Sequence, residues 1–329
     1  MNRRSSTRRC RPIALFLAAL AAATTGLAQE HTQTTTAPAA PASRPAIFDA
    51  GADAKAQLAA ALAAAKRENQ RVLVMFGGNW CGWCHRLHAL FQENQDIART
   101  LLYEYRLVLV DVGRFDKNLD VAGGYGVELK KSGVPFLTVL DSEGKVLANQ
   151  ETGSLETETA HDPQKVLAFL DKWKAAPQDA EAVLADGLAR ATRDHKLVFL
   201  RLGAPRCPWC HKLEDFLANP EVAQILGLDF VDVKIDVDRM KNGKEVAGRF
   251  RPSDKAGIPW FAFLAADGTT LATSDGPDGN IGYPVQPAEI EHFLSMLKKT
   301  TRRVSADQVG RIEKLLRAAA ESIPADRRG

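Results

Sequence analysis

Four cysteines fall into two identical arrangements, and their spacing is the clearest chemical signal in the sequence. Cys81 and Cys84 form one Cys-x-x-Cys pair, and Cys207 and Cys210 form the other. A disulfide across so short a loop stabilises the fold little, because the stabilisation grows with the length of the closed loop. Cysteines at this spacing can open and close a disulfide without moving the backbone. The pairs are therefore interpreted as redox-active.

Each pair follows a short apolar run and opens a segment with helical spacing. Residues 71–76 and 197–202 are rich in β formers and are predicted to be buried strands. A cysteine at a helix start lies among unpaired N–H groups and at the positive end of the helix dipole, which favour a thiolate. We therefore expect the first cysteine of each pair to be the nucleophile. The second, deeper in the helix, resolves the mixed disulfide.

Four further residues are candidates for tuning the pKa of the nucleophiles. His85 and His211 follow the nucleophiles by four residues, on the same helical face. A protonated imidazole there would stabilise a thiolate; the alternative is a polar surface residue beside the site. Arg206 directly precedes Cys207, and Arg201 lies in the strand before it. These cations predict a lower pKa for Cys207 and a more oxidising second pair.

The cysteine pairs belong to a tandem duplication. Cys81 and Cys207 are 126 positions apart, and Pro135 and Pro259 are 124 apart. A repeat of this length has the size of a domain. We expect a signal peptide (1–28) and a flexible Thr/Ala/Pro linker (29–46). A first domain (47–176), a second domain (177–302), and a C-terminal helix and tail (303–329) follow.

The first 28 residues have the pattern of an export signal. Five arginines precede an apolar stretch at 13–23, and Gly26 and Ala28 supply small residues for a cleavage site. An uncleaved membrane anchor is the alternative, but the apolar stretch is short for a membrane span. The fifth cysteine, Cys10, lies ahead of the stretch. The sequence predicts a periplasmic or secreted protein that is free of the membrane after cleavage.

Composition excludes several classes of protein. The chain has 329 residues, 45% hydrophobic and 25% charged, which is ordinary for a globular protein. Its formal charge is +3, but the five arginines of the signal account for the excess: without them, 38 bases face 40 acids. No basic stripe for nucleic acid is therefore expected.

The order of predicted elements indicates an α/β fold. The first copy gives helix, strand, cysteine-bearing helix, second helix, strand, hairpin and closing helix. The second repeats the opening helix at 179–194, the strand, the cysteine pair, the next strand, the hairpin and the closing helix. This order implies a mixed sheet with helices on both faces. Residues 305–322 add an amphipathic helix outside the duplication.

A buried strand, then Trp80-Cys81-Gly82-Trp83-Cys84, then Val134-Pro135 before a hairpin strand resembles the thioredoxin superfamily. Cys207-Pro208-Trp209-Cys210 and Ile258-Pro259 repeat the pattern. The resemblance implies two thioredoxin-like folds in tandem and cis peptide bonds before Pro135 and Pro259. It also implies a substrate groove beside the cysteines, formed by Val134, Pro135, Ile258, Pro259, Trp80, Trp83 and Trp209.

The resemblance implies an exported thiol–disulfide oxidoreductase that acts on protein thiols and disulfides and meets a redox partner protein. No cofactor and no metal are expected, and reductase, oxidase and isomerase all stay open. Members of the family often carry a buried acid six residues before the first cysteine. Met75 and Arg201 occupy those positions here, so the group that moves the proton is not identified.

Two alternatives from other classes remain. Both motifs read Cys-x-x-Cys-His, which also fits a dihaem c-type cytochrome, although the preceding strands and the paired prolines argue against it. The other alternative is a non-catalytic thioredoxin-like module that binds proteins, or holds a metal through the cysteines and histidine. His88 is then the local candidate for a fourth ligand.

Overall fold

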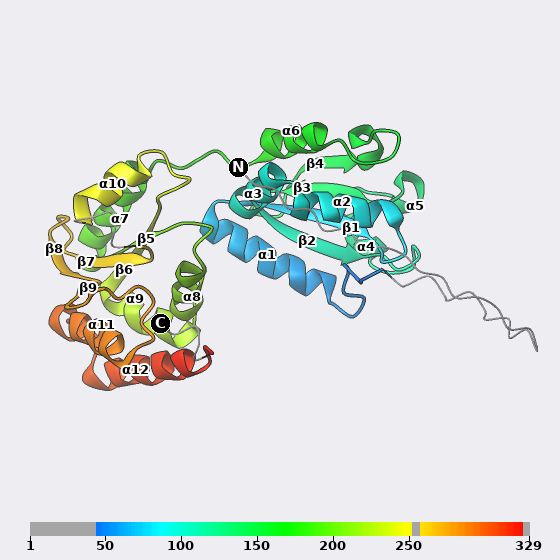
Figure 1. Cartoon of the computed structure of the whole chain (residues 1–329). Coiled ribbons are helices and arrows are strands. Elements are labelled where there is room, and N and C mark those ends of the chain that lie inside the picture. Colours follow the sequence, from blue (N-terminus) through cyan, green and yellow to red (C-terminus); the bar gives the residue numbers. More distant parts are fainter. Residues whose placement is uncertain (1–43, 252–256, 325–329) are drawn as a thin grey trace, which may run out of the picture. The chain divides into compact units, whose positions relative to one another are not determined.

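The computed structural model describes residues 44–251 and 257–324, so the predicted signal peptide and the linker up to residue 43 lie outside the described residues. The described chain contains two four-stranded sheets with similar topology, one in each predicted domain (Figure 1). None of the described helices is both long and apolar enough to span a bilayer.

The first domain alternates strands and helices in the expected order. Its elements are α1 (Ala54–Glu68), β1 (Arg71–Gly77), α2 (Gly82–Glu93), α3 (Gln95–Glu104), β2 (Tyr105–Asp111), α4 (Leu119–Gly124), α5 (Leu129–Ser132), β3 (Phe136–Leu140), β4 (Val146–Glu151), the 3-10 helix η1 (Thr152–Leu155) and α6 (Pro163–Trp173).

The sheet of the first domain is mixed, with strand order β2-β1-β3-β4. β1 pairs parallel with β2 and antiparallel with β3, and β3 pairs antiparallel with β4. Every residue of β1 after Arg71 is buried, as expected for a central strand covered on both faces.

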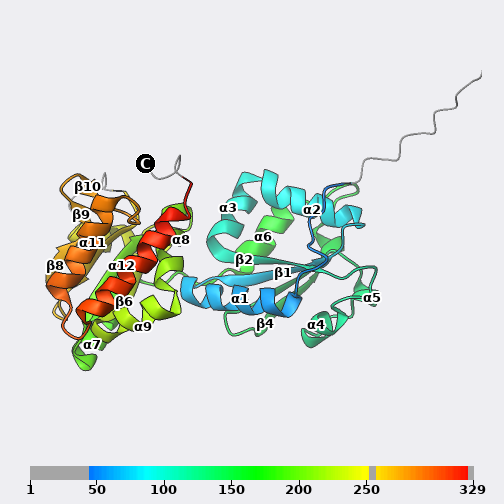
Figure 2. The same cartoon turned by 90° about the horizontal axis from the view of Figure 1, so that it is seen from below.

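Side chains of β1 alternate between two hydrophobic clusters. Leu73 and Met75 pack with residues of α2, α3 and α6 on one face. Val72, Val74 and Phe76 pack with residues of α1 and α4 on the other (Figure 2). The alternation follows from the period-2 geometry of a strand. It holds the C-terminal end of β1 rigidly at the start of α2.

The second domain repeats this plan. Its elements are α7 (Ala180–Asp194), β5 (Leu197–Gly203), α8 (Pro208–Leu217), α9 (Pro220–Asp229), β6 (Phe230–Asp236), α10 (Gly243–Phe250), β7 (Trp260–Leu264), β8 (Thr270–Thr273), β9 (Asp275–Gly276), β10 (Gly279–Asn280), α11 (Pro287–Thr300) and α12 (Ala306–Glu321).

Its main sheet has the order β6-β5-β7-β8, with β5 parallel to β6 and antiparallel to β7. Helices α7 and α10 contribute to the cluster on one face, and α8, α9 and α11 to the cluster on the other. α12, the predicted helix outside the duplication, completes the second cluster with Val309, Ile312 and Leu316. The fold class is thus confirmed: two thioredoxin-like folds in tandem and a C-terminal helix.

Several short elements were not predicted from the sequence. The stretch between β2 and β3 contains α4 and α5, and α9, α10 and the β9–β10 ribbon occur in the second domain. α4 contains Gly123 and Gly124, and α5 spans only four residues, so neither carries a helical repeat long enough to detect.

Candidate functional site

The backbone presents each cysteine pair at the start of a helix. Cys81 is the N-cap of α2, and its Sγ accepts a hydrogen bond from the N–H of Cys84 at 3.1 Å. Cys207 is the N-cap of α8, and its Sγ accepts the corresponding bond from Cys210 at 3.0 Å. Both sulfurs that were predicted to be nucleophiles therefore lie where N–H groups of the first turn favour negative charge.

Both pairs form disulfides in this structure. Cys81 is 5% exposed and Cys84 fully buried, while Cys207 is 8% exposed and Cys210 2%. The first cysteine of each pair is thus the more accessible one. This order agrees with the roles predicted for them.

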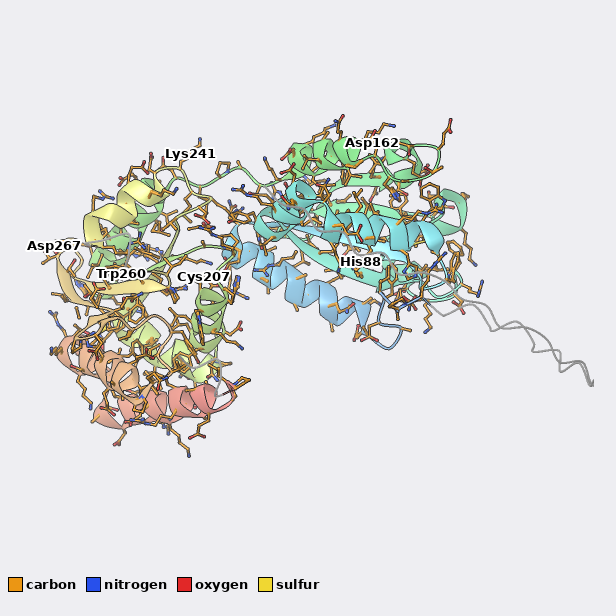
Figure 3. The ribbon with its side chains drawn as sticks, in the orientation of Figure 1. His88, Asp162, Cys207, Lys241, Trp260 and Asp267 are labelled. Carbon is orange, nitrogen blue, oxygen red and sulfur yellow. A yellow bond between two sulfur atoms is a disulfide. The ribbon has the colours of Figure 1, made fainter. Side chains whose placement is uncertain are left out.

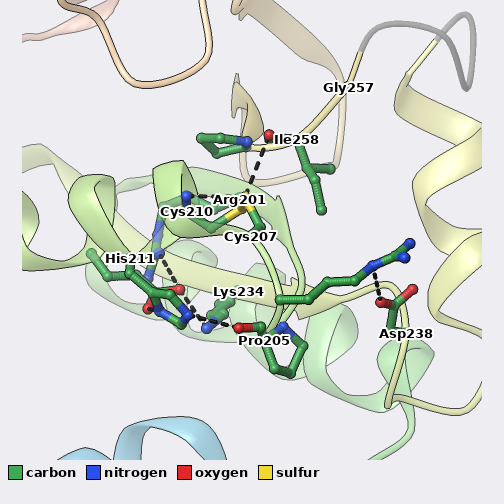
Figure 4. Close-up of a disulfide and its surroundings, with 12 residues drawn as sticks. Arg201, Pro205, Cys207, Cys210, His211, Lys234, Asp238, Gly257 and Ile258 are labelled. Atoms are coloured by element: carbon green, nitrogen blue, oxygen red, sulfur yellow. Dashed lines mark hydrogen bonds and ion pairs between the residues drawn. A yellow bond between two sulfur atoms is a disulfide. The ribbon is translucent and has the colours of Figure 1, made fainter. Parts of the chain in front are cut away.

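The predicted groove residues lie beside the disulfides. The Val134–Pro135 and Ile258–Pro259 peptide bonds are both cis. The Sγ of Cys81 lies 3.6 Å from the carbonyl oxygen of Val134. The Sγ of Cys207 lies 3.4 Å from the carbonyl oxygen of Ile258 (Figure 4). In each domain the fold therefore brings a Cys-x-x-Cys pair and a proline about fifty residues later to one place.

A glycine at the end of the central strand makes room for each buried sulfur. A Cβ on Gly77 would lie 2.7 Å from the Sγ of Cys84 and 2.6 Å from the ring of Phe48. A Cβ on Gly203 would lie 3.3 Å from the Sγ of Cys210. The first site is the more tightly packed, because Phe48 covers it in addition.

The two motif histidines stabilise the turn that precedes each helix. The Nε2 of His85 lies 2.9 Å from the carbonyl oxygen of Asn79, and that of His211 lies 2.8 Å from the carbonyl oxygen of Pro205. In addition, a hydrogen bond with Glu214 raises the pKa of His211 against the opposing effect of burial. The two histidines thus share a position but differ in charge environment.

A charged cluster lies on the β5–β6–α8 side of the second site (Figure 4). Arg201 forms a bidentate ion pair with Asp232, at 2.6 and 2.7 Å. Lys234 lies 2.5 Å from the carboxylate of Glu214, on α8. Burial opposes ionisation of Glu214, but His211 and Lys234 outweigh it and lower its pKa to about 2. This cluster was missed from the sequence, since its members come from three separate elements.

The first site has no such cluster. The strand registers of the two sheets show which residues are equivalent. Met75 is equivalent to Arg201, Leu107 to Asp232, and Leu109 to Lys234. His88 stands at the position of Glu214 (Figure 3). Burial and the neighbouring His85 lower the pKa of His88. The side of the first disulfide that faces β1, β2 and α2 is therefore apolar and neutral.

The residue before each nucleophile contacts the loop after the second strand. The Nε1 of Trp80 donates to the carbonyl oxygen of Gly113. In the second domain, Arg206 forms an ion pair with Asp238 at 3.3 Å (Figure 4). Because Arg206 and Arg201 are both paired with carboxylates, their combined effect on Cys207 is smaller than the sequence alone predicts.

The tryptophan inside each motif packs against a ring from the segment before the last helix. Trp83 meets His161 edge to face at 5.3 Å, and Trp209 stacks with Tyr283 at 6.3 Å. The His161 side chain is fully buried, and neither ring nitrogen has a hydrogen-bond partner. Burial, together with the charge of Arg86, lowers the pKa of His161 to about 4. Sequence reasoning gave His161 no role, because nothing in its neighbourhood along the chain points to Trp83.

Comparison with known families agrees with this geometry. A family model described as "Thioredoxin-like" matches residues 53–142. A second model, Thioredox_DsbH, described as "Protein of unknown function, DUF255", matches residues 162–306. The chain belongs to the thioredoxin superfamily.

Individual relatives match at modest identity. Protein disulfide-isomerase 1 of Dictyostelium discoideum is 25% identical over 268 residues, which cover 78% of this chain and 67% of that protein. Human Spermatogenesis-associated protein 20 is 32% identical over 72 residues. That match covers 22% of this chain but only 9% of the human protein.

Among solved structures, a disulphide isomerase from Xylella fastidiosa Temecula1 is 34% identical, with a TM-score of 0.35. The match covers 38% of this chain and 95% of the solved one. Two of these relatives are named disulfide isomerases, and the family model over residues 53–142 is described as thioredoxin-like.

Proposed function

We propose that the protein is an exported thiol–disulfide oxidoreductase that exchanges disulfides with protein substrates at both cysteine pairs. One observation carries the proposal. In each domain a Cys-x-x-Cys disulfide caps a helix, with its more exposed sulfur beside the carbonyl that precedes a cis-proline. A substrate segment in that groove would place its own sulfur next to the nucleophile.

The chemistry balances without a further cofactor. In the reduced enzyme, the Cys81 thiolate attacks one sulfur of a substrate disulfide; an S–S bond forms to Cys81, and the other substrate sulfur leaves as a thiolate that takes a proton from water. Cys84, deprotonated, then attacks Cys81 and releases the second substrate thiolate. Two electrons pass from enzyme to substrate. Oxidation of a substrate dithiol is the reverse, and Cys207 and Cys210 act in the same way.

Export is part of the proposal and is supported by the basic and apolar pattern of the first 28 residues. An oxidising compartment suits a protein whose four cysteines outside that segment all pair as disulfides. The proposed partners are proteins with exposed disulfides or thiols, and a redox protein that resets the cysteine pairs.

The test is reduction of insulin by the full chain, with dithiothreitol as the source of electrons and turbidity as the readout. We expect Cys81→Ser and Cys207→Ser each to leave activity at the other pair, and the double variant to fall to the uncatalysed rate. A Cys84→Ala variant should accumulate a mixed disulfide at Cys81 that mass spectrometry identifies. Full activity in the double variant would contradict the proposal.

The same preparations separate the alternatives. A dihaem cytochrome would show the visible absorption bands of haem, and a non-catalytic module would bind insulin chains without exchange. The Nε2 atoms of His85 and His211 are engaged by backbone carbonyls, which favours the thiol–disulfide proposal over haem ligation.

A further inference from the structure

An arginine lies over the ring of each tryptophan in the first motif. Trp80 is 41% exposed; the guanidinium of Arg114 lies 5.6 Å from its ring centre. The guanidinium of Arg86 lies 4.6 Å from the ring centre of Trp83. Arg86 and Arg114 are both exposed. An arginine over a ring face keeps the N–H groups at its edge free to bind a carboxylate.

A third arginine lies over the glycine between the two cysteines. A Cβ on Gly82 would meet the guanidinium of Arg44 at 3.2 Å. The side chain of Asn79 fixes the segment that carries Arg44, because its Oδ1 accepts hydrogen bonds from the N–H groups of Ile47 and Phe48. We call Trp80, Trp83, Arg44, Arg86 and Arg114 together the arginine–tryptophan face.

The charge of this face is not neutralised. Within residues 44–251 and 257–324, no carboxylate oxygen lies within ion-pair distance of the guanidinium of Arg44, Arg86 or Arg114. Of the nearby acids, Asp116 accepts a hydrogen bond from the backbone N–H of Arg114. Glu156 lies beside the buried His161. The face therefore presents three cations and two aromatic rings around Cys81.

The second domain lacks this arrangement. Arg206 replaces Trp80, and Asp238 offsets its charge at 3.3 Å. Pro208 replaces Gly82, and Lys212 replaces Arg86. Lysine offers a point charge instead of a planar fork, so it is the weaker partner for a carboxylate. The two sites therefore present different surfaces to a substrate.

We propose that the arginine–tryptophan face makes the first site selective for polypeptide segments that carry acidic and aromatic or apolar side chains next to the reacting cysteine. The inference rests on the proposed exchange activity and names the substrate class for one of its two sites. Carboxylates of the substrate would bind the guanidinium edges, and its apolar side chains would cover the exposed ring of Trp80. The second site is not selective in this way.

The experiment measures mixed-disulfide formation in the reduced full-length protein that keeps only the first pair, through Cys207→Ser and Cys210→Ser. Two cysteine peptides, activated as the same aromatic disulfide, differ only in glutamates or lysines beside the cysteine. Each rate is divided by the rate at which dithiothreitol reduces the same activated peptide, which corrects for differences in peptide reactivity. We expect the acidic peptide to react about 10-fold faster at low ionic strength. The preference should shrink toward unity in 1 M salt.

Variants locate the effect. Arg86→Gln and Arg114→Gln should each reduce the preference about threefold, and Arg86→Lys less. Lys66→Gln, an exposed change on α1, is the control for net charge and should leave the preference intact. In the protein that keeps only the second pair, through Cys81→Ser and Cys84→Ser, the acidic peptide should react faster than the basic one by about threefold or less.

The outcomes separate the two proposals. Equal rates with both peptides at low salt, with exchange intact, would overturn the selectivity and leave the exchange activity standing. A preference equal in the two single-pair proteins would also overturn it, because it would then arise from overall charge. No exchange with either peptide would refute the proposed function itself.

Discussion

The two cysteine pairs share a backbone and differ in what surrounds it. In both, the first sulfur caps a helix and lies beside the carbonyl preceding a cis-proline. Around the first pair are Met75, Leu109 and His88; around the second are Arg201, Lys234 and Glu214. The geometry of attack is therefore duplicated, whereas the electrostatic environment is not. The comparison separates what exchange requires from what adjusts it.

The first way to sharpen the comparison is through the glycines that face the buried sulfurs. Gly77→Ala brings a methyl group to within 2.7 Å of Sγ of Cys84 and against the ring of Phe48. We expect the opening free energy of the first domain to fall by about 2–3 kcal/mol, because overpacking a dense core forces its neighbours apart. Hydrogen exchange of β1 amides, followed by mass spectrometry, measures it.

Gly203→Ala is the matched change in the second domain. Its Cβ would meet Sγ of Cys210 at 3.3 Å, a contact that a small shift relieves. The opening free energy measured at β5 amides should therefore fall by less than about 1 kcal/mol. Equal losses in the two domains would show that Phe48 does not make the first site the tighter one.

Much of this scaffold is predictable from the sequence. The strands predicted at 71–76 and 197–202 extend over Arg71–Gly77 and Leu197–Gly203, and a helix follows each cysteine pair, as expected. Each copy also has its predicted closing helix, at Pro163–Trp173 and Pro287–Thr300. These segments have a strong period or a clear start signal, such as Pro163 and Pro287 at the first turn of their helices. The positions of Pro135 and Pro259 beside the cysteines followed from the family resemblance.

The surroundings of the cysteines were harder to predict, and the reason is physical. Arg201 was read as a cation that acts on Cys207, but its charge is offset by Asp232, which lies 31 residues further along on the neighbouring strand. The contact of His161 with Trp83 likewise spans a long stretch of chain. Local periodicity reports which face a residue occupies but not which distant side chain meets it.

A second test compares the reduction potentials of the two pairs. On the sheet side of the second site, the hydrogen bond with Glu214 favours protonated His211 behind the nucleophile, whereas the matching side of the first site has Met75, Leu109 and His88. We expect the Cys207–Cys210 pair to be the more oxidising, by on the order of 30 mV, because a stabilised thiolate favours the reduced form. Equilibration with glutathione buffers, quantified by differential alkylation of each pair, gives both potentials.

Glu214→Gln makes this test specific. It removes the carboxylate that favours protonated His211, so the reduction potential of the second pair should fall toward that of the first. His88→Gln, at the matching position on α2, exchanges one neutral polar group for another and should leave the first potential within error. A second pair equal to, or more reducing than, the first would refute the electrostatic account and leave redundancy as the reason for the duplication.

The smallest expected effect is on the pH dependence of stability, through the rings that pack against the motif tryptophans. His161 has a pKa of about 4 in the folded protein against an ordinary value of 6.5, because it is buried. The unfolded chain therefore takes up a proton first as the pH falls, and the stability that neutral His161 provides is complete above pH 6.5 and is lost toward pH 4. Between pH 7 and pH 6 the first domain should lose roughly 0.7 kcal/mol.

His161→Phe keeps a ring against Trp83 and removes the titrating group, so hydrogen exchange of β1 amides should lose this part of its pH dependence. Tyr283→Phe is the matched change beside Trp209, and it should leave the pH dependence of β5 amides as it was. His211 contributes with the opposite sign: its raised pKa gives stability that is present at low pH and lost as the pH rises. Between pH 7 and pH 6 these two histidines should therefore change the stability of their domains in opposite directions, and an unchanged slope in His161→Phe would show that the pKa of His161 is not lowered in the folded protein.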